Sequence, residues 1–183
     1  MTYDFTQFKK KIIEIEEWFK KELSQIRTGR ATPIILDSIS VESYGSYMGI
    51  NQLAGITIED PKTIRVVPWD MTQVKNIEKA VTDSNLGLSV SVDDRGLRII
   101  FPELTSERRV SLAKIAKQKL EEARVSLRQE REGVREDIQE KEKKGGVGED
   151  DKFRFNAELQ KYVDEANKKL DELAERKEKE ILE

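Results

Sequence analysis

The apolar residues of three long segments recur every three or four positions, and this spacing constrains the fold more than any other feature of the sequence. The stripes cover 5–26, 112–138 and 155–181. Such spacing places apolar side chains along one face of an α-helix. Because a helix of this kind is not stable with its stripe exposed, we predict that the three helices pack as a long antiparallel three-helix bundle.

Local signals indicate where these helices begin and end. Asp4 can cap the first helix, and Gly29 lies where a residue in the left-handed conformation would end it. The second helix is expected to start after Thr105, an N-cap residue, and to end near Lys144. Gly145–Gly148 then interrupts the chain before the third helix.

The segment between the first two helices has a different composition, with all four prolines and five of the ten glycines. It contains one helical stretch, at 72–84, and short runs with strand character at 39–44, 56–59, 63–67, 88–92 and 97–101. Residues 93–96 are typical of a hairpin turn. We therefore predict an α+β fold in which a bundle of residues 1–30 and 105–183 carries a small inserted mixed α/β domain at 31–104.

The chain crosses twice between the two predicted domains, at 30–33 and 101–105, and each crossing contains a proline. Two short connections of this kind should form a hinge that can swing but cannot twist freely. The predicted hinge residues are Arg30, Ala31, Thr32, Pro33, Pro102, Glu103, Leu104 and Thr105.

The chain of 183 residues has neither Cys nor His, which excludes thiol and imidazole catalysis, disulfides and Cys/His zinc sites. The carboxylate pairs Asp93-Asp94 and Asp150-Asp151 fit a hairpin turn and a helix start. No glycine-rich phosphate loop or catalytic metal motif is present. We expect no catalytic residue, metal or cofactor, so the protein is predicted not to be an enzyme.

No apolar run approaches the ~18–20 residues of a membrane helix, and the first residues lack a signal-peptide core. We expect a soluble, cytoplasmic monomer with no membrane partner.

Basic charge is concentrated in one part of this slightly acidic chain. The net charge is −3, yet residues 106–131 carry eight basic and four acidic residues, a local net charge of +4. Five cations fall on one line of the second helix, and we call them the basic stripe: Lys117, Arg124, Arg128, Arg131 and Arg135. They could be a solvated face with ion pairs, for example from Glu121 to Arg124 or Arg128. They could instead bind phosphates, which suit the arginine fork.

A second basic patch, Arg27 and Arg30, lies at the end of the first helix. Cations are favourable there on helix-dipole grounds alone. Arg108 and Arg109 begin the second helix, where the dipole disfavours them, and such a local conflict is typical of functional sites.

Several motifs, in order along the whole chain, resemble those of bacterial and organellar ribosome recycling factors. They are Ile26–Pro33 with Leu36-Asp37, Tyr44-Gly45, Asn51–Ala54, Pro68–Asp70, Ile77–Ala80, Asp83–Leu88, Pro102–Arg109 and Glu122–Arg128. The resemblance implies an L-shaped molecule whose bundle and smaller β/α/β domain meet at a two-strand hinge. It also implies binding to the large ribosomal subunit after termination, against 23S-type rRNA at the intersubunit bridges. Elongation factor G with GTP would then drive subunit separation, and the protein itself would perform no covalent chemistry.

By position, the resemblance assigns RNA contacts to Arg27, Arg30, Lys117, Arg124, Arg128 and Arg131. The sequence departs from the family pattern after Arg131, where Glu132 replaces a usual arginine and Gly133 follows in place of a helix former. The Thr-Pro that usually follows the Tyr-Gly motif is also missing. A helical scaffold or chaperone that binds proteins and not ribosomes is the alternative function.

Overall fold

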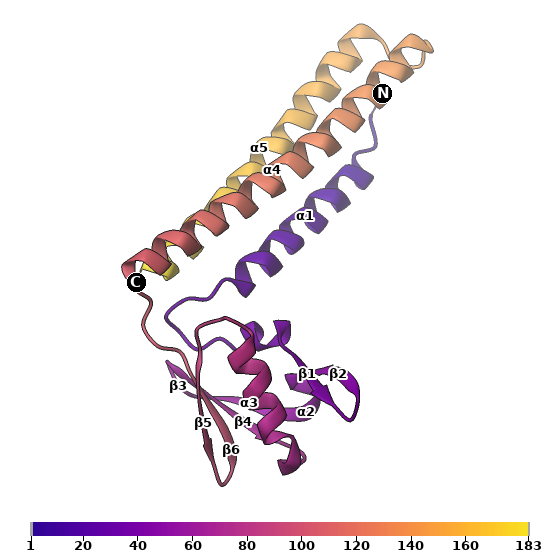
Figure 1. Cartoon of the computed structure of the whole chain (residues 1–183). Helices are drawn as coiled ribbons and strands as arrows, with labels where there is room; N and C mark the ends of the chain where they lie inside the picture. Colours follow the sequence, from indigo (N-terminus) through magenta and orange to yellow (C-terminus); the bar gives the residue numbers. More distant parts are fainter. Residues whose placement is uncertain (1, 183) are drawn as a thin grey trace. The chain divides into compact units, whose positions relative to one another are not determined.

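The computed structural model describes residues 2–182. The chain divides into two compact units (Figure 1). We call the first the bundle unit, which contains the chain up to Leu23 and Lys114–Glu178, and the second the small unit, which contains Ser24–Ala113 and the chain from Lys179. The contacts thus group 24–30 and 105–113 with the small unit. The domain boundaries at residues 30 and 105 stay a prediction.

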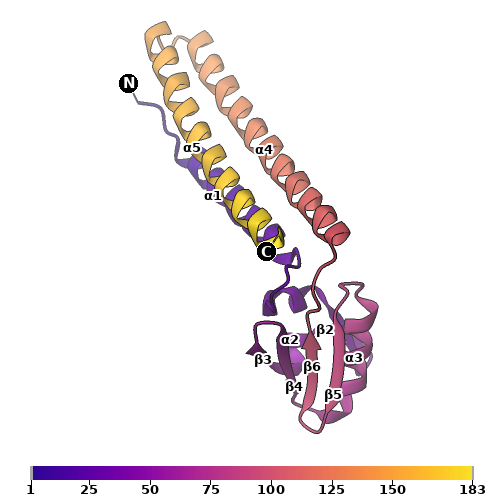
Figure 2. The same cartoon turned by 90° about the vertical axis from the view of Figure 1, so that its left-hand side faces the viewer.

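Three helices form the bundle unit, and Figures 1 and 2 show them alongside one another. They are α1 (Thr6–Gln25), α4 (Ser106–Lys143) and α5 (Glu149–Leu182), of which the last residues of α1 and α5 and the first of α4 lie in the small unit. The predicted apolar faces are buried. Phe19, Leu127 and Leu170 are among the most enclosed side chains, with at most 1% exposed.

Contacts between the helices define their directions. Lys119 of α4 pairs with Glu22 near the end of α1 at 3.0 Å, whereas Asp137 of α4 accepts a hydrogen bond from Tyr3, before α1. These helices are therefore antiparallel. Phe5 packs on Tyr162 with ring centroids 5.4 Å apart, and Glu16 pairs with Lys169, so α1 and α5 run parallel.

Capping residues set both ends of α4. The N–H of Arg108 donates to the Thr105 hydroxyl at 3.2 Å, which confirms the predicted N-cap. After Lys143, Gly145 adopts a left-handed φ of 76°, and the N–H of Gly146 donates to the Lys141 carbonyl at 2.9 Å. The helix is 38 residues long, as expected from the spacing of its caps.

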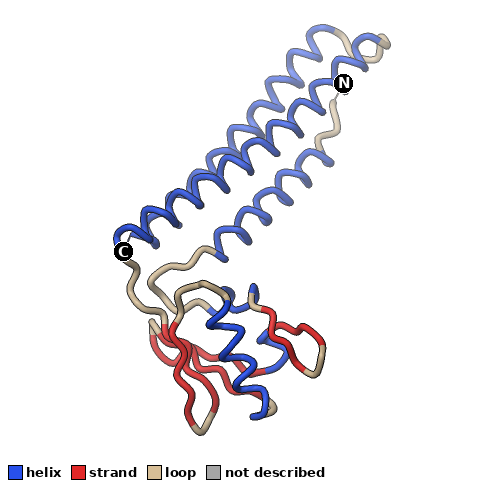
Figure 3. The backbone as a smooth tube through the Cα atoms, in the orientation of Figure 1, coloured by secondary structure: helices blue, strands red, loops and turns tan. Residues whose placement is uncertain are grey.

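Two antiparallel sheets lie in the small unit (Figure 3). The smaller pairs β1 (Ser40–Ser43) with β2 (Ser46–Gly49). The larger has the order β3-β4-β6-β5, with bounds Ala54–Asp60, Thr63–Pro68, Gly96–Ile100 and Ser89–Asp93, respectively. β5 and β6 meet with Asp93 opposite Gly96, so the predicted hairpin is confirmed.

One face of the four-stranded sheet packs against α3 (Val74–Asp83) to form the core of the small unit. Ile64 and Val66 flank Arg65 on β4, and Leu97 and Ile99 flank Arg98 on β6. These four apolar side chains are fully buried. The remaining elements are the short helix α2 (Ile50–Leu53) and the 3₁₀ turns η1 (Pro33–Ser38) and η2 (Met71–Gln73).

The predicted end of the first helix is wrong. α1 stops at Gln25, and Gly29 does not adopt the left-handed conformation expected of a helix C-terminus. The chain leaves the helix early because the side chain of Arg27, just beyond it, is bonded to carbonyls of distant segments of the small unit.

Candidate nucleic-acid interface

The basic stripe lies on α4 within the bundle unit, and its side chains differ in how far they reach into solvent. The side chains of Lys117, Arg128 and Arg135 are mostly exposed, and that of Arg128 is 60% exposed. Arg131 is only 27% exposed. The stripe therefore forms a surface beside the buried face, with Arg128 as its most accessible arginine.

Carboxylates accompany the stripe at its N-terminal half. Lys117 pairs with Glu178 of α5 at 3.1 Å, and Arg124 pairs with Asp171 of α5 at 2.7 Å. Glu121 lies 3.6 Å from Arg124 and 3.9 Å from Arg128, so the ion pairs considered from the sequence do form. They are exposed and contribute little to stability, so they leave the arginines able to exchange partners.

At the C-terminal half of the stripe, one carboxylate serves two arginines. Oε1 of Glu132 lies 2.5 Å from Nη2 of Arg131 and 3.5 Å from Nη1 of Arg135. The hydrogen bond from Arg131 lowers the pKa of Glu132, which keeps this carboxylate charged. The residue that departs from the family pattern therefore neutralises part of the stripe.

Arg27, for which the resemblance predicts an RNA contact, is largely buried in the small unit. Arg27 as a whole is only 7% exposed. Its guanidinium donates to the carbonyls of Leu86 at 2.9 Å, Gly87 at 2.8 Å and Pro102 at 2.5 Å. Burial lowers its pKa, and the nearby charge of Arg108 adds to the effect. The guanidinium is thus used to join three segments of the small unit.

The predicted hinge residues fall into two groups. Ala31 is buried, and its N–H donates to the carbonyl of Pro61 at 2.8 Å. The N–H of Phe101 donates to the adjacent carbonyl, of Lys62, also at 2.8 Å. Both connections are therefore fixed to the turn between β3 and β4, a pairing for which the sequence carries no local signal.

The other hinge residues lie around these fixed points. Thr32 precedes η1, and Pro33 begins it. Glu103 pairs with Lys62 at 2.7 Å, Leu104 is buried, and Thr105 caps α4. Arg30 is exposed at the surface of the small unit.

Arg109 explains part of the charge conflict at the start of α4. Its guanidinium donates to the carbonyl of Ile181 at 2.8 Å and to that of Leu104 at 3.4 Å. A cation at the C-terminal end of α5 is favourable, which compensates for its place at the N-terminal end of α4. Arg108 stays exposed.

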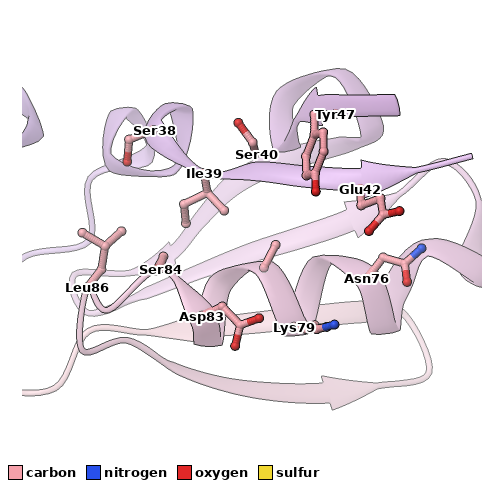
Figure 4. Close-up of a pocket in the computed structure, with 11 residues that line it drawn as sticks. Ser38, Ile39, Ser40, Glu42, Tyr47, Asn76, Lys79, Asp83, Ser84 and Leu86 are labelled. Carbon is pink, nitrogen blue, oxygen red and sulfur yellow. The ribbon is translucent and has the colours of Figure 1, made fainter. Parts of the chain in front are cut away.

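A polar groove of about 420 Å³ lies between β1 and α3 in the small unit (Figure 4). Glu42 and Tyr47 project from the strands, and Lys79 and Asp83 from the helix. None of the residues that line the groove is among those predicted from the sequence to bind RNA.

Carboxylates elsewhere are also accounted for by structure. Asp93 pairs with Arg65 at 2.6 Å on the outer face of the sheet. Within residues 2–182, no group of three or more Asp or Glu side chains is placed to hold a metal ion. No helix in this same part of the chain is long and apolar enough to cross a membrane.

Comparison with known proteins agrees with the motifs. The family model for ribosome recycling factor matches residues 19–182. The ribosome-recycling factor of Bradyrhizobium sp. (strain BTAi1) is 39% identical over 180 residues, which cover 98% of this chain and 96% of the relative. That of Symbiobacterium thermophilum is 41% identical, with 95% and 92% covered.

Solved structures give the same result. A solution structure of the ribosome recycling factor superimposes with a TM-score of 0.73 at 36% identity, covering 97% of this chain and 95% of that one. A second match has a TM-score of 0.66 at 39% identity and covers 98% and 97%. It comes from models of the T. thermophilus ribosome recycling factor and E. coli elongation factor G bound to the E. coli post-termination complex. The chain therefore belongs to the ribosome recycling factor family.

Proposed function

We propose that this protein is a cytoplasmic translation factor that binds the large ribosomal subunit after termination. Together with elongation factor G and GTP, it separates the post-termination complex into subunits for reuse. The observation that carries this proposal is the match to ribosome-recycling factors over 98% of the chain at 39% identity. In this role the protein performs no covalent reaction, because the energy comes from the GTP of its partner.

The RNA-binding surface in this proposal is the basic stripe together with Arg30. Lys117, Arg124, Arg128 and Arg131 lie on one side of α4, and arginine forks suit phosphate oxygens. Arg27 is left out of this set because carbonyl groups already use its guanidinium.

The hinge is the moving part in this proposal. With Ala31 and Phe101 both bonded to the β3–β4 turn, bending is expected in the residues just outside these anchors, around Thr28–Arg30 and Pro102–Thr105. Elongation factor G would act on the small unit, and the bundle unit would hold the large subunit.

Gradient sedimentation of post-termination ribosomes tests the function directly. The protein, elongation factor G and GTP together should convert these ribosomes into free subunits, and omission of any one should prevent it. Persistence of intact ribosomes with all three present would contradict the proposal. A protein-binding scaffold would show no preference for purified large subunits, so a binding assay separates the alternative function.

A further inference from the structure

Two carboxylates on α4 each lie within 4 Å of two arginines of the basic stripe. Glu121 lies near Arg124 and Arg128, and Glu132 lies near Arg131 and Arg135. They are 11 residues apart, which is close to three helical turns, so both lie on the same side of the helix. Acidic and basic side chains are therefore mixed along the surface that binds RNA in the proposed function.

The two carboxylates hold their arginines with different strength. Glu121 is 3.6 Å and 3.9 Å from its two partners, and its side chain is 58% exposed. Glu132 is 2.5 Å and 3.5 Å from its partners and is 46% exposed. Charge-assisted bonds strengthen as they shorten, so Glu132 is the stronger of the two.

The bonds to Glu132 occupy the edge of Arg131 that would bind a phosphate. Both Nε, at 3.1 Å, and Nη2, at 2.5 Å, donate to Oε1 of Glu132. This edge of the guanidinium carries the parallel N–H groups that form bidentate bonds with carboxylates and phosphates. An RNA phosphate can reach that edge only if the carboxylate leaves it.

We propose that Glu132, and more weakly Glu121, compete with RNA phosphates for the stripe arginines and thereby limit the affinity of the protein for the large subunit. The inference rests on the proposed function, and it adds an internal competitor to it. When RNA binds, each carboxylate gives up its arginines to phosphates and keeps its own negative charge beside them. Both effects weaken the complex and favour release of the protein after subunit separation.

Charge-neutral variants of the full-length protein test this inference through binding to purified large subunits at several salt concentrations. Glu132→Gln should raise the affinity by about two- to tenfold at low salt, because ion pairs of this exposure are modest. It should also steepen the log–log salt dependence by up to about one unit, because an added phosphate contact releases about one counterion. Glu121→Gln should act in the same direction with a smaller effect.

Glu130→Gln is the matched control, because it makes the same change in net charge on the same helix. Glu130 lies two residues from Glu132 and therefore points about 160° away from it, and its charge acts on Lys11 of α1. This variant should leave the affinity within about twofold of the unsubstituted protein. Thermal unfolding of all three variants shows whether a change in affinity reflects a change in folding.

The outcomes separate this inference from the proposed function. If Arg128→Glu weakens binding while Glu132→Gln and Glu130→Gln have the same affinity for large subunits, the stripe binds RNA but the proposed competition by Glu132 is wrong. If Arg128→Glu leaves both the affinity and the salt dependence unchanged, RNA does not contact the stripe, and both the assigned surface and the competition are wrong.

Discussion

Gly133 lies in the interior of α4, where a glycine weakens the helix. A Cβ added there would meet nothing within 4 Å, and its backbone is not among the positions with positive φ. Gly133→Ala should therefore raise the free energy of unfolding by about 0.5–1 kcal/mol, because alanine loses less backbone entropy in a helix. Urea unfolding measures the change.

Gly96 supplies the contrasting control for this prediction. Its φ is 131°, and a Cβ would lie 2.4 Å from the carbonyl oxygen of Val66. Gly96→Ala should destabilise the protein, since both the conformation and the space require glycine. A stabilising effect of Gly96→Ala, or none from Gly133→Ala, would contradict these assignments.

Arg27 is predicted to stabilise the small unit without contacting RNA. Arg27→Ala leaves the carbonyls of Leu86, Gly87 and Pro102 without their donor and should cost about 1–3 kcal/mol in the free energy of unfolding. Arg27→Lys keeps the charge but cannot span all three carbonyls, so its effect should be intermediate.

The salt dependence of ribosome binding separates this structural role from RNA binding. With Arg27 buried in the small unit, its replacement by lysine should leave the salt slope unchanged. If Arg27→Ala instead reduced the slope of log affinity against log salt concentration by about one unit, Arg27 would contact RNA, as the sequence predicts.

At the scale of elements, the sequence predicts most accurately the ends of helices whose capping hydrogen bonds join residues close together in the chain. Thr105 caps the start of α4, and the turn at Gly145-Gly146 ends it, through hydrogen bonds that span three to five positions, so both ends could be predicted. The end of α1 depends on bonds from Arg27 to Leu86 and beyond, which no local pattern reveals. The sequence does not predict β2 or α2, because each has only four residues and depends on the neighbouring elements against which it packs.

Asp137 joins the segment before α1 to α4, and this contact should respond to pH. Hydrogen bonds from Lys141, at 2.7 Å, and from Tyr3 hold the pKa of Asp137 below its usual range. The ionised carboxylate therefore contributes stability above the unfolded pKa of about 3.9, and this is lost as the pH falls through the folded value.

Asp137→Asn should accordingly lower the free energy of unfolding at neutral pH. The difference in this free energy between the variant and the unsubstituted protein should narrow below about pH 4. Chemical unfolding at a series of pH values measures this difference. A constant difference from pH 7 to pH 3 would show that the charge of Asp137 contributes nothing.

At the scale of the whole molecule, the sequence predicts the candidate site only in part. The basic stripe follows from helical periodicity within α4, and so does Glu121, which is three residues from Arg124. Asp171 and Glu178 are on α5 and reach Arg124 and Lys117 only because the bundle brings the helices together. Charge pairing across helices depends on packing and register, which the apolar spacing alone does not define.

The proposed hinge predicts that the distance between the two units changes during subunit separation. The chain contains no cysteine, so Lys161→Cys in α5 and Ser91→Cys in β5 place one dye in each unit at exposed positions. Energy transfer between the dyes should change when elongation factor G and GTP are added to ribosome-bound protein, in step with subunit release. Two dyes at Ser91→Cys and Lys75→Cys should show no such change, because both positions lie between the anchors at Ala31 and Phe101 and therefore on the same side of the proposed hinge. Constant transfer between the units through complete subunit separation would mean that the protein acts as a rigid wedge, with its connections at Ala31 and Phe101 serving only to join the two units.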